Sequence, residues 1–504
     1  MSGTSLVYDE SQPITSLETA GMQPQAYPTG YEAAFDIYDG LVRFNSKLGF
    51  QPDLATSWSV SKDGLTWTFN LRKGVKFQDG TSFNADAVVS DYTTMLNPSS
   101  NKGAYSLWAP IASVKKVDDY TIQIVTKTPY EALLNVMAHG SALIPSPAAV
   151  TKYGSDYKLH PVGTGPYEVQ KFDPGTELVL KRNPNYFGTK SGYNTITFQY
   201  VPDPSTRIAA LQSGQAQIID AVPTQNVQQL KALKNINVTV QPGLQVVGIG
   251  LNETDPILQD VKVRQALNYA VDKSSIIKTL FNGEATKLDS PLAPDISGHA
   301  SVGNYDYNQA KAESILQSDG WTKGSDGILQ KNGKQLALTF EVPNGAYPQD
   351  VQIGQVVQNQ LQAIGVKVTI NKIEKAQFWN SLKVPQAKSS VFDMVLFGYN
   401  PSHGDPYIDL ESLYGSNSTP SAPPSLWNYE WYSNPTVDRD LQNALQSVDI
   451  QTRDHYLTDA QKQIWNDAPY IWLYVPDLIT ASSSSVQGIN ILPVGFNILR
   501  NAHK

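Results

Sequence analysis

The segment Pro52–Tyr92, "PDLATSWSVSKDGLTWTFNLRKGVKFQDGTSFNADAVVSDY", contains a clear strand pattern between two turn signals. Within it, residues 65–77 ("LTWTFNLRKGVKF") alternate apolar and polar side chains with a period of two, which is typical of a half-buried strand. The Asp63-Gly64 and Asp79-Gly80 pairs flank this run, and Asp-Gly pairs favour tight hairpin turns. The same alternation recurs in "YTIQIV" and "TELVLKR". The segment therefore predicts β-hairpins.

Two tracts with a helical period lie farther along the chain. In "VKVRQALNYAVDKSSIIKTLFNG" (residues 261–283), apolar residues share one helix face: Val263, Ala266, Leu267, Ala270 and Val271. Asp272 can cap a second helix there, and Gly283 can end it. "DYNQAKAESILQSDGW" predicts another helix, which begins at Asp306 or Asn308 and ends near Gly320. Because strand and helix signals alternate throughout, we expect mixed α/β or α+β lobes.

Length and composition limit the class of protein. At 504 residues the chain exceeds the size at which one core keeps growing, so two or three lobes are expected. A formal net charge of -8 argues against nucleic acid as the main partner, because that partner requires a basic surface. There are no cysteines, which excludes disulfides and thiolate metal sites. No apolar run is long enough to span a membrane, and the first residues resemble a mature start from which an export signal was removed.

Motifs of common catalytic sites do not occur. We find no P-loop, zincin helix, EF-hand loop or nucleophile elbow, and the six histidines are not spaced as metal ligands on a helix. Carboxylates are plentiful, but nothing in the sequence positions a glycosidase pair. The 26 tyrosines and 9 tryptophans suit ligand clefts instead, since each joins an apolar ring to a hydrogen-bonding group. The sequence therefore favours a binding protein over an enzyme.

Several stretches together resemble one family along nearly the whole chain and in the same order. They are "YDGLVRFN", the segment Pro52–Tyr92, "GTGPYEVQKFDPGTELVLKRNPNYFG", "VPDPSTRIAALQSGQAQIID" and "VKVRQALNYAVDK". On these stretches the chain resembles the family 5 solute-binding proteins, which serve ABC importers of peptides, nickel chelates and some sugars. Most of these motifs have structural readings as turns and helix caps, so they identify a scaffold and leave the cargo open.

The resemblance implies a fold and a domain organisation. The fold class is α/β and periplasmic-binding-protein-like (type II, large cluster C), a two-lobe clam with an additional subdomain. Lobe I would comprise residues 1–242 plus 481–504, with the extra subdomain at about 41–160. Lobe II would comprise residues 243–480, and hinge crossings would lie near Gly243 and Ala481. Closure of the lobes would bury the ligand and strengthen its polar contacts.

The resemblance also implies a function. The protein would be an extracytoplasmic receptor, periplasmic or a cell-surface lipoprotein, that delivers a small ligand to ABC transporter permease subunits. Membrane contact is expected only through a lipid anchor, and we expect a monomer with no cofactor, no bound metal and no catalytic activity. The ligand is expected to be an oligopeptide, the dominant cargo of the family. An oligosaccharide of the cello- or xylo-type is the alternative, and a nickel chelate or a glycan-acting enzyme is less favoured.

The loop in "FGYNPSHGDPYIDL" (Phe397–Leu410) bears on that choice. Peptide-binding members carry an aspartate there, three positions before an acidic residue followed by Pro, that pairs with the peptide ammonium. Here the matching position is Ser402, ahead of Asp405-Pro406. Because a neutral hydroxyl cannot offset the desolvation of an ammonium as a carboxylate can, this departure disfavours the usual grip on free N-termini.

Nickel-chelate binders carry a tryptophan and a histidine in the same loop, with arginines facing it. The aligned positions here are Asn400 and Tyr407, and no arginine occurs between Arg72 and Arg182. His403 could ligate a metal, but a lone loop histidine is more often solvated. The hydrogen-bonding groups and rings of this loop also suit the hydroxyls and faces of a sugar, which keeps the oligosaccharide alternative open.

Candidate ligand-contacting residues follow from position within the resemblance, although a packing role explains each aromatic equally well. They are Tyr27 and Tyr31 before the "YDGL" stretch, Tyr105 and Trp108 in a subdomain loop, Tyr399, Asn400, Ser402, His403 and Asp405 in the loop above, and Trp427, Asn428 and Tyr429 before a predicted "SNP" turn.

Overall fold

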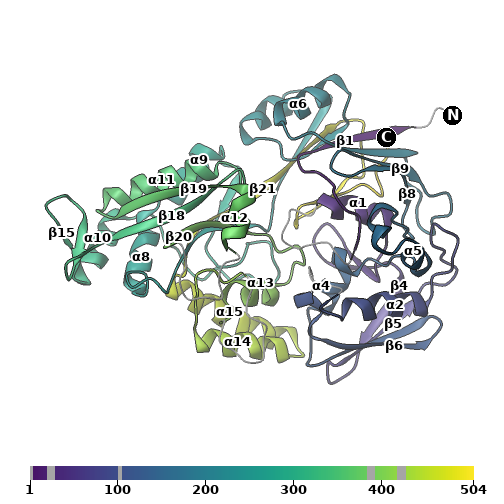
Figure 1. Ribbon diagram of the computed structural model, residues 1–504, viewed down its shortest axis with the longest axis horizontal. Helices are drawn as coiled ribbons and strands as arrows, with labels where there is room; N and C mark the ends of the chain where they lie inside the picture. The colour runs from purple at the N-terminus through teal and green to yellow at the C-terminus, as the bar shows by residue number, and fades with distance from the viewer. Residues whose placement is uncertain (1–3, 20–28, 100–104, 383–391, 417–426) are drawn as a thin grey trace. The chain divides into compact units, whose positions relative to one another are not determined.

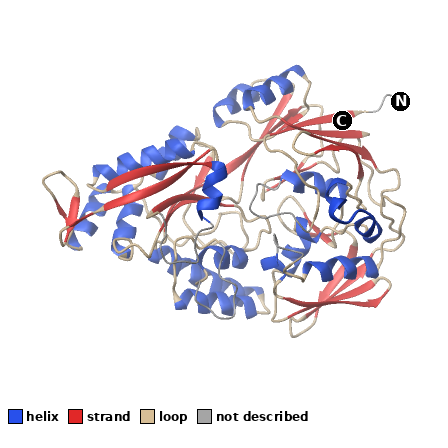
Figure 2. Ribbon diagram, in the orientation of Figure 1, coloured by secondary structure: helices blue, strands red, loops and turns tan. Residues whose placement is uncertain are grey.

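The strands and helices expected from the sequence form two units in the computed structural model (Figure 1). The structure describes residues 4–19, 29–99, 105–382, 392–416 and 427–504. Unit 1 contains Met1–Gln241, Ser402–Gly404 and Leu478–Lys504, and unit 2 contains Pro242–Pro401 and Asp405–Asp477. Each unit mixes strands and helices, as Figure 2 shows, which confirms the α/β class.

The main sheet of unit 1 is built around β1 (Ser5–Glu10). It pairs in parallel with β10 (Thr195–Tyr200) and β11 (Ile218–Ile219), while β9 (Glu177–Arg182) and β8 (Tyr167–Asp173) extend the β10 side antiparallel. The last residues of β21 (Tyr470–Ser483) pair with β11. Alternation along β1 buries Leu6 and Tyr8 completely.

A second, antiparallel sheet of unit 1 contains two strands from the segment Pro52–Tyr92. Its order is β4 (Ala55–Val60), β5 (Thr66–Leu71), β7 (Thr121–Thr126) and β6 (Ile111–Asp118). The hairpin prediction is confirmed, but β5 is shorter than the alternating run, because Gly74 takes a positive φ of 77° and turns the chain. Helix α2 (Ala85–Met95) packs on β6, and Asn84 caps it.

The remaining elements of unit 1 are helices, short 3-10 turns and strands. They are α1 (Thr29–Ile37), β2 (Val42–Phe44), β3 (Phe50–Pro52), α3 (Tyr105–Trp108), α4 (Leu133–Ala138), η1 (Gly140–Ala142), α5 (Pro147–Tyr153), η2 (Gly154–Leu159), α6 (Pro204–Ser213), η3 (Thr224–Asn226), α7 (Val227–Lys231), β12 (Ile236–Pro242), β22 (Asn490–Leu492) and β23 (Phe496–Ile498).

The sheet of unit 2 places β20 (Met394–Tyr399) at its centre. β20 lies between β18 (Ala337–Asn344), with which it is parallel, and β13 (Val246–Leu251), with which it is antiparallel. β19 (Lys367–Glu374) continues beyond β18, and the first part of β21 continues beyond β13. The apolar run of β20 is buried on both faces, as expected for a central strand.

Helices cover this sheet and form a second layer beside it. α11 (Asp350–Ala363) packs on β18 and β19, and α14 (Pro435–Gln446) packs on α15 (Ile450–Asp467). The other elements of unit 2 are α8 (Val261–Ala270), α9 (Lys273–Leu280), β14 (Ala285–Lys287), α10 (Gln309–Ser318), β15 (Thr322–Lys323), β16 (Leu329–Lys331), β17 (Lys334–Gln335), α12 (Lys375–Leu382) and α13 (Pro406–Tyr414).

The predicted helix boundaries in unit 2 are confirmed at their caps. The Asp272 carboxylate accepts from the backbone of Ser275 at the start of α9, and the Asn308 side chain accepts from Lys311 at the start of α10. α9 ends at Leu280, and Asn282 and Gly283 then take positive φ angles. In the described part of the chain, no helix is both long and apolar enough to cross a bilayer.

Candidate functional site

Six aromatic side chains of unit 2, which we call the ring group, lie against one another near the end of β20. They are Tyr347, Trp379, Phe397, Tyr399, Trp427 and Tyr429. Neighbouring ring centroids lie 5.3 to 6.5 Å apart, and most pairs meet edge to face. Such pairs add stability beyond the area they bury, so the rings hold one another in place.

The strand period explains how the ring group assembles. Phe397 and Tyr399 are two residues apart in β20, so their side chains point to the same face of the sheet. Tyr347 follows β18, and its hydroxyl donates to the carbonyl of Gly398 at 3.3 Å. A Cβ at Gly398 would lie 2.8 Å from the Tyr347 ring, so only glycine lets this ring lie against the strand.

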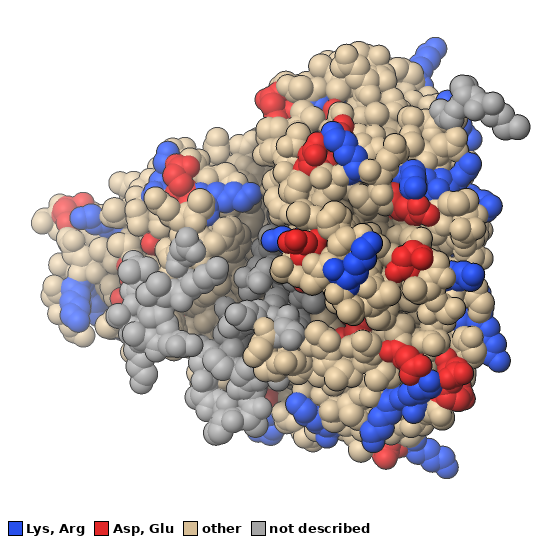
Figure 3. Space-filling view, turned by 45° about the vertical axis from the view of Figure 1, so that its right-hand side comes forward, with Lys and Arg blue, Asp and Glu red and all other residues tan. Residues whose placement is uncertain are grey.

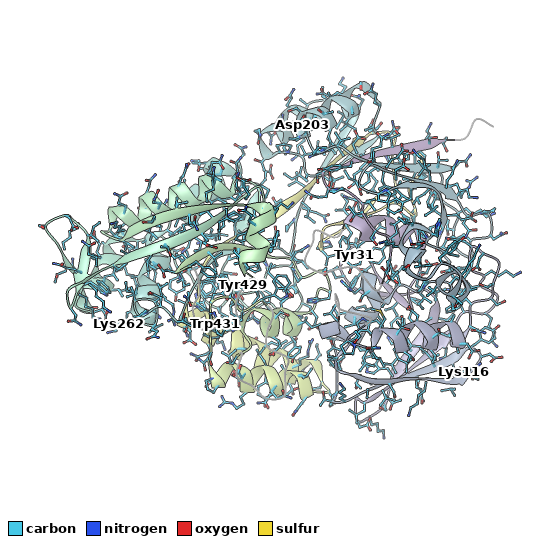
Figure 4. All side chains as sticks on the ribbon, in the orientation of Figure 1. Tyr31, Lys116, Asp203, Lys262, Tyr429 and Trp431 are labelled. Atoms are coloured by element: carbon cyan, nitrogen blue, oxygen red, sulfur yellow. The ribbon has the colours of Figure 1, made fainter. Side chains whose placement is uncertain are left out.

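The ring group has a buried base and partly exposed outer members. The side chains of Phe397 and Tyr347 are only 2% and 6% exposed. The half-buried members are Trp379, Tyr399, Trp427 and Tyr429. Burial raises the pKa of Tyr399 and of Tyr429, so both hydroxyls stay protonated. Unit 2 therefore offers apolar ring faces with neutral hydroxyls, and Figure 4 labels Tyr429 among them.

Asn428 holds the turn that carries two members of the ring group. Its amide donates to the carbonyls of Gly415 at 2.9 Å and Tyr432 at 2.8 Å, and its oxygen accepts from the Tyr432 backbone at 2.9 Å. The side chain is 4% exposed. These contacts give Asn428 a positioning role for Trp427 and Tyr429.

The loop tip Ser402–Gly404 belongs to unit 1, although its neighbours in sequence belong to unit 2. The Asn135 amide on α4 donates to the backbone carbonyls of His403 at 2.9 Å and Gly404 at 3.0 Å. The Ser402 hydroxyl lies 3.1 Å from Nε2 of His139. Ser402 and His403 are both 3% exposed, so the polar groups of this loop are organised and not solvated.

His139 is the centre of this polar cluster in unit 1. Its Nδ1 lies 2.9 Å from the Ser141 hydroxyl, and that hydroxyl accepts from Nε1 of Trp108 at 3.1 Å. The Tyr31 ring on α1, labelled in Figure 4, meets the imidazole edge to face at 5.1 Å. Burial lowers the pKa of His139 to about 3, with nearby His403 contributing, so the imidazole is neutral near pH 7.

Asp405 is engaged in a buried ion pair. Its carboxylate contacts Nη2 of Arg453 at 2.8 and 2.9 Å and caps α13 by accepting from the backbones of Tyr407 and Ile408. The carboxylate side chain is 2% exposed. The charge of this carboxylate is therefore already balanced by Arg453.

The structure brings together some of the predicted ligand-contacting residues. Tyr399, Trp427 and Tyr429 share the ring group. Tyr31 and Ser402 contact His139, and Trp108 contacts Ser141 beside it. Trp108 is fully buried against Tyr92, and Asn400 is half-buried just after β20. Tyr27 and the side chain of Tyr105 lie outside the described residues. Ligand contact stays a prediction for all twelve.

Sequence reasoning missed six residues of these clusters. They are Tyr347, Trp379, Phe397, Asn135, His139 and Ser141. Alternation in β20 could have indicated Phe397, since it shares a face with Tyr399. Nothing local marks the other five, because sheet order and tertiary packing bring them into place.

The described residues contain no metal-binding cluster, and the face in Figure 3 shows no extended patch of one charge. Among the described residues, no three His, Asp or Glu side chains are arranged to hold a metal ion. On the face in Figure 3, basic and acidic side chains are interspersed and no extended patch carries one sign. Rings and neutral dipoles therefore characterise both clusters.

Comparison with known proteins places this geometry in a family. Residues 49–421 match the model of the bacterial extracellular solute-binding proteins, family 5 Middle. The glutathione-binding protein GsiB of Pectobacterium atrosepticum is 34% identical over 463 residues, covering 91% of this chain and 87% of that protein.

Solved structures agree. NikZ from Campylobacter jejuni in complex with Ni(L-His) superposes with a TM-score of 0.84 at 25% identity, covering 100% of both chains. DppA from Helicobacter pylori in complex with peptide STSA gives 0.82 at 26% identity, covering 99% of this chain and 98% of that one.

These matches confirm the resemblance to family 5 solute-binding proteins and the predicted fold class. Members of this family are transport receptors that act outside the cytoplasm, and they do not catalyse reactions. The chain belongs to the bacterial extracellular solute-binding proteins of family 5 and is a substrate-binding receptor of an ABC importer.

Proposed function

We propose that this receptor captures a short peptide, with glutathione and other tripeptides as the first candidates, and delivers it to the permease. The observation that carries the proposal is the ring group, whose four half-buried members offer ring faces and two of which, Tyr399 and Tyr429, carry neutral hydroxyls. Peptide side chains and amide planes stack on such rings, and amide groups pair with the hydroxyls.

The relatives add support from their own ligands. The relative described above is named a glutathione-binding protein, and the DppA structure contains a peptide. These relatives lend no support to the oligosaccharide alternative. Nickel chelate is the second candidate, because the NikZ structure holds Ni(L-His). The stretch without arginine between Arg72 and Arg182 disfavours an anionic chelate.

The proposal keeps the predicted lobes, residues 1–242 with 481–504 and residues 243–480. The crossings near Gly243 and Ala481 would act as the hinge on which the lobes close over the peptide, in a monomer. A lipid anchor stays a prediction. A smaller radius of gyration in X-ray scattering on addition of the ligand would support closure.

Calorimetric titration and thermal shift with a panel of compounds test the ligand. The panel contains glutathione, di- to pentapeptides, cello- and xylo-oligosaccharides, and nickel with histidine. A ligand at 100 times its Kd should add about 2.7 kcal/mol to the stability. Heat and a thermal shift with peptides only are the expected result, and a response confined to sugars or to nickel with histidine would refute the proposal.

A matched pair of tryptophan variants places the ligand on the protein. Trp427→Ala removes a half-buried member of the ring group, whereas Trp58→Ala removes a half-buried tryptophan of β4 in unit 1. We expect the first to weaken peptide binding by about tenfold or more, since stacking and burial contribute at least 1.4 kcal/mol. The second should leave the Kd unchanged.

A further inference from the structure

The hydrogen bonds around His139 fix which of its nitrogens carries the proton. The backbone N–H of Ser141 points at Nδ1 of His139 at 3.2 Å, and a backbone N–H can only donate. Nδ1 must therefore accept and carries no hydrogen. The Trp108 indole supports this direction, because its N–H donates to the Ser141 hydroxyl and leaves that hydroxyl to donate to Nδ1.

A neutral imidazole with a bare Nδ1 carries its hydrogen on Nε2. Nε2 lies 3.1 Å from the Ser402 hydroxyl oxygen, so the imidazole donates and Ser402 accepts. The hydrogen of the Ser402 hydroxyl is then left to donate. Within the described residues, this hydroxyl makes no hydrogen bond other than the one to His139.

Packing keeps the imidazole in this orientation. Tyr31 meets its ring edge to face, and a Cβ at Gly140 would lie 2.2 Å from the Tyr31 ring, so glycine is required for this approach. His139, Ser141 and Trp108 are each at most 1% exposed. A buried chain of hydrogen bonds polarises along its length, which strengthens the last donor in it.

We propose that the chain from Trp108 through Ser141 and His139 makes Ser402 a hydrogen-bond donor to the ligand, so that Ser402 favours a carbonyl or carboxylate oxygen of a peptide over an ammonium. This inference rests on the proposed function for the identity of the ligand. Trp108, Ser141 and His139 are positioning residues, and Ser402 is the group that touches the ligand. The polarity is opposite to that of an aspartate, which can only accept when ionised.

Binding of glutathione to Ser402 variants tests whether the Ser402 hydroxyl donates a hydrogen bond to the ligand. Ser402→Ala should raise the Kd by about tenfold, the size of one hydrogen bond with a polarised partner. Ser402→Asp should raise it further, because a carboxylate repels an oxygen acceptor. Ser213→Ala, which removes an exposed hydroxyl that bonds to Ala210, is the control and should change nothing. Unchanged binding by Ser402→Ala, or tighter binding by Ser402→Asp, would overturn the inference.

The positioning role of His139 is tested by a conservative pair. Glutamine can present an amide N–H near the position of Nε2, whereas leucine cannot. We expect His139→Gln to keep most of the affinity and His139→Leu to lose about tenfold. Equal affinities for glutathione in folded forms of both variants would argue against donation from this position.

Nitrogen NMR of the histidine-labelled protein separates this inference from the proposed function. The spectrum should show His139 with a protonated Nε2 and a bare Nδ1, without titration between pH 5 and 8. A proton on Nδ1 would overturn the inference even if glutathione binds. If no peptide binds the wild-type protein, both the proposed function and the ligand named here are wrong. The tautomer of His139 still shows in which direction the hydrogen bonds from Trp108 to Ser402 run.

Discussion

Replacing Glu430 with glutamine should stabilise the protein at neutral pH and leave its stability at pH 4 nearly unchanged. Glu430 directly follows Tyr429 of the ring group, and its side chain has no exposed surface. A Cβ at Gly250 of β13 would lie 2.4 Å from Oε1 of Glu430, which shows how closely the carboxyl group lies against the strand. Burial raises the pKa of Glu430 to about 8, and the Tyr470 hydroxyl offsets only part of this effect.

The sign and size follow from linkage. In the unfolded chain this carboxyl group has the ordinary pKa of 4.5, so above that pH it ionises on unfolding, while the folded protein keeps it neutral up to about 8. The neutral form's contribution to stability is therefore complete below pH 4.5 and is lost as the pH rises toward 8. At about 1.4 kcal/mol per pH unit, the loss at pH 7 is roughly 3 kcal/mol. Because glutamine is neutral at every pH, the variant does not lose this stability as the pH rises.

Urea unfolding of wild type and Glu430→Gln at half-unit intervals from pH 4 to 8 measures the difference. Above pH 4.5 the free energy of unfolding of the variant should exceed that of the wild type by an increasing amount, roughly 3 kcal/mol at pH 7. Its dependence on urea concentration should be unchanged. Glu374→Gln, at an exposed position, should follow the wild type at every pH. Parallel curves for the wild type and Glu430→Gln would mean that Glu430 is already ionised in the folded protein, and the reasoning would be wrong.

Two further substitutions test packing and charge near the candidate site. Gly398→Ala should lower the Tm and destabilise by about 1–3 kcal/mol, because the new methyl group meets the Tyr347 ring at 2.8 Å; an unchanged Tm in calorimetry would show that the ring can move away. Arg453→Met should cost about 3–5 kcal/mol in urea unfolding at pH 7, because it leaves the Asp405 carboxylate buried without its cation. Arg439→Met removes a cation that is 64% exposed and lies 3.5 Å from Asp440, and it should cost under about 1 kcal/mol, so equal effects of the two arginine variants would contradict this account.

Local signals in the sequence were sufficient to predict several helices and strands. The caps at Asp272 and Asn308 and the buried strand β20 depend on residues within a few positions of one another, so periodicity and capping rules predict them. The alternating run at residues 65–77 predicted a longer strand than β5, because alternation continues past the Gly74 turn.

The clusters of the candidate site depend on contacts between residues that are far apart in the sequence. Tyr399, Trp427 and Tyr429 were predicted from position in the family pattern. Tyr347 joins them because β18, which it follows, lies beside β20, and Trp379 joins them from α12, which follows β19. His139 carries no recognisable spacing, and its contact with Ser402 links residues 263 positions apart. Topology, which no single stretch encodes, brings these groups together.

The order of segments along the chain constrains when each unit can be completed during synthesis. Nearly all of unit 2 is one continuous stretch, whereas unit 1 needs the last residues of the polypeptide. Asn497 donates to the Tyr8 hydroxyl at 2.7 Å and to the Glu32 carboxyl group, and Arg500 contacts Asp39 at 2.8 Å. Until these residues leave the ribosome, the acidic groups near the N-terminus lack their buried partners. A chain truncated after Asp477 and released from the ribosome should therefore resist proteolysis in unit 2 and be cleaved in unit 1.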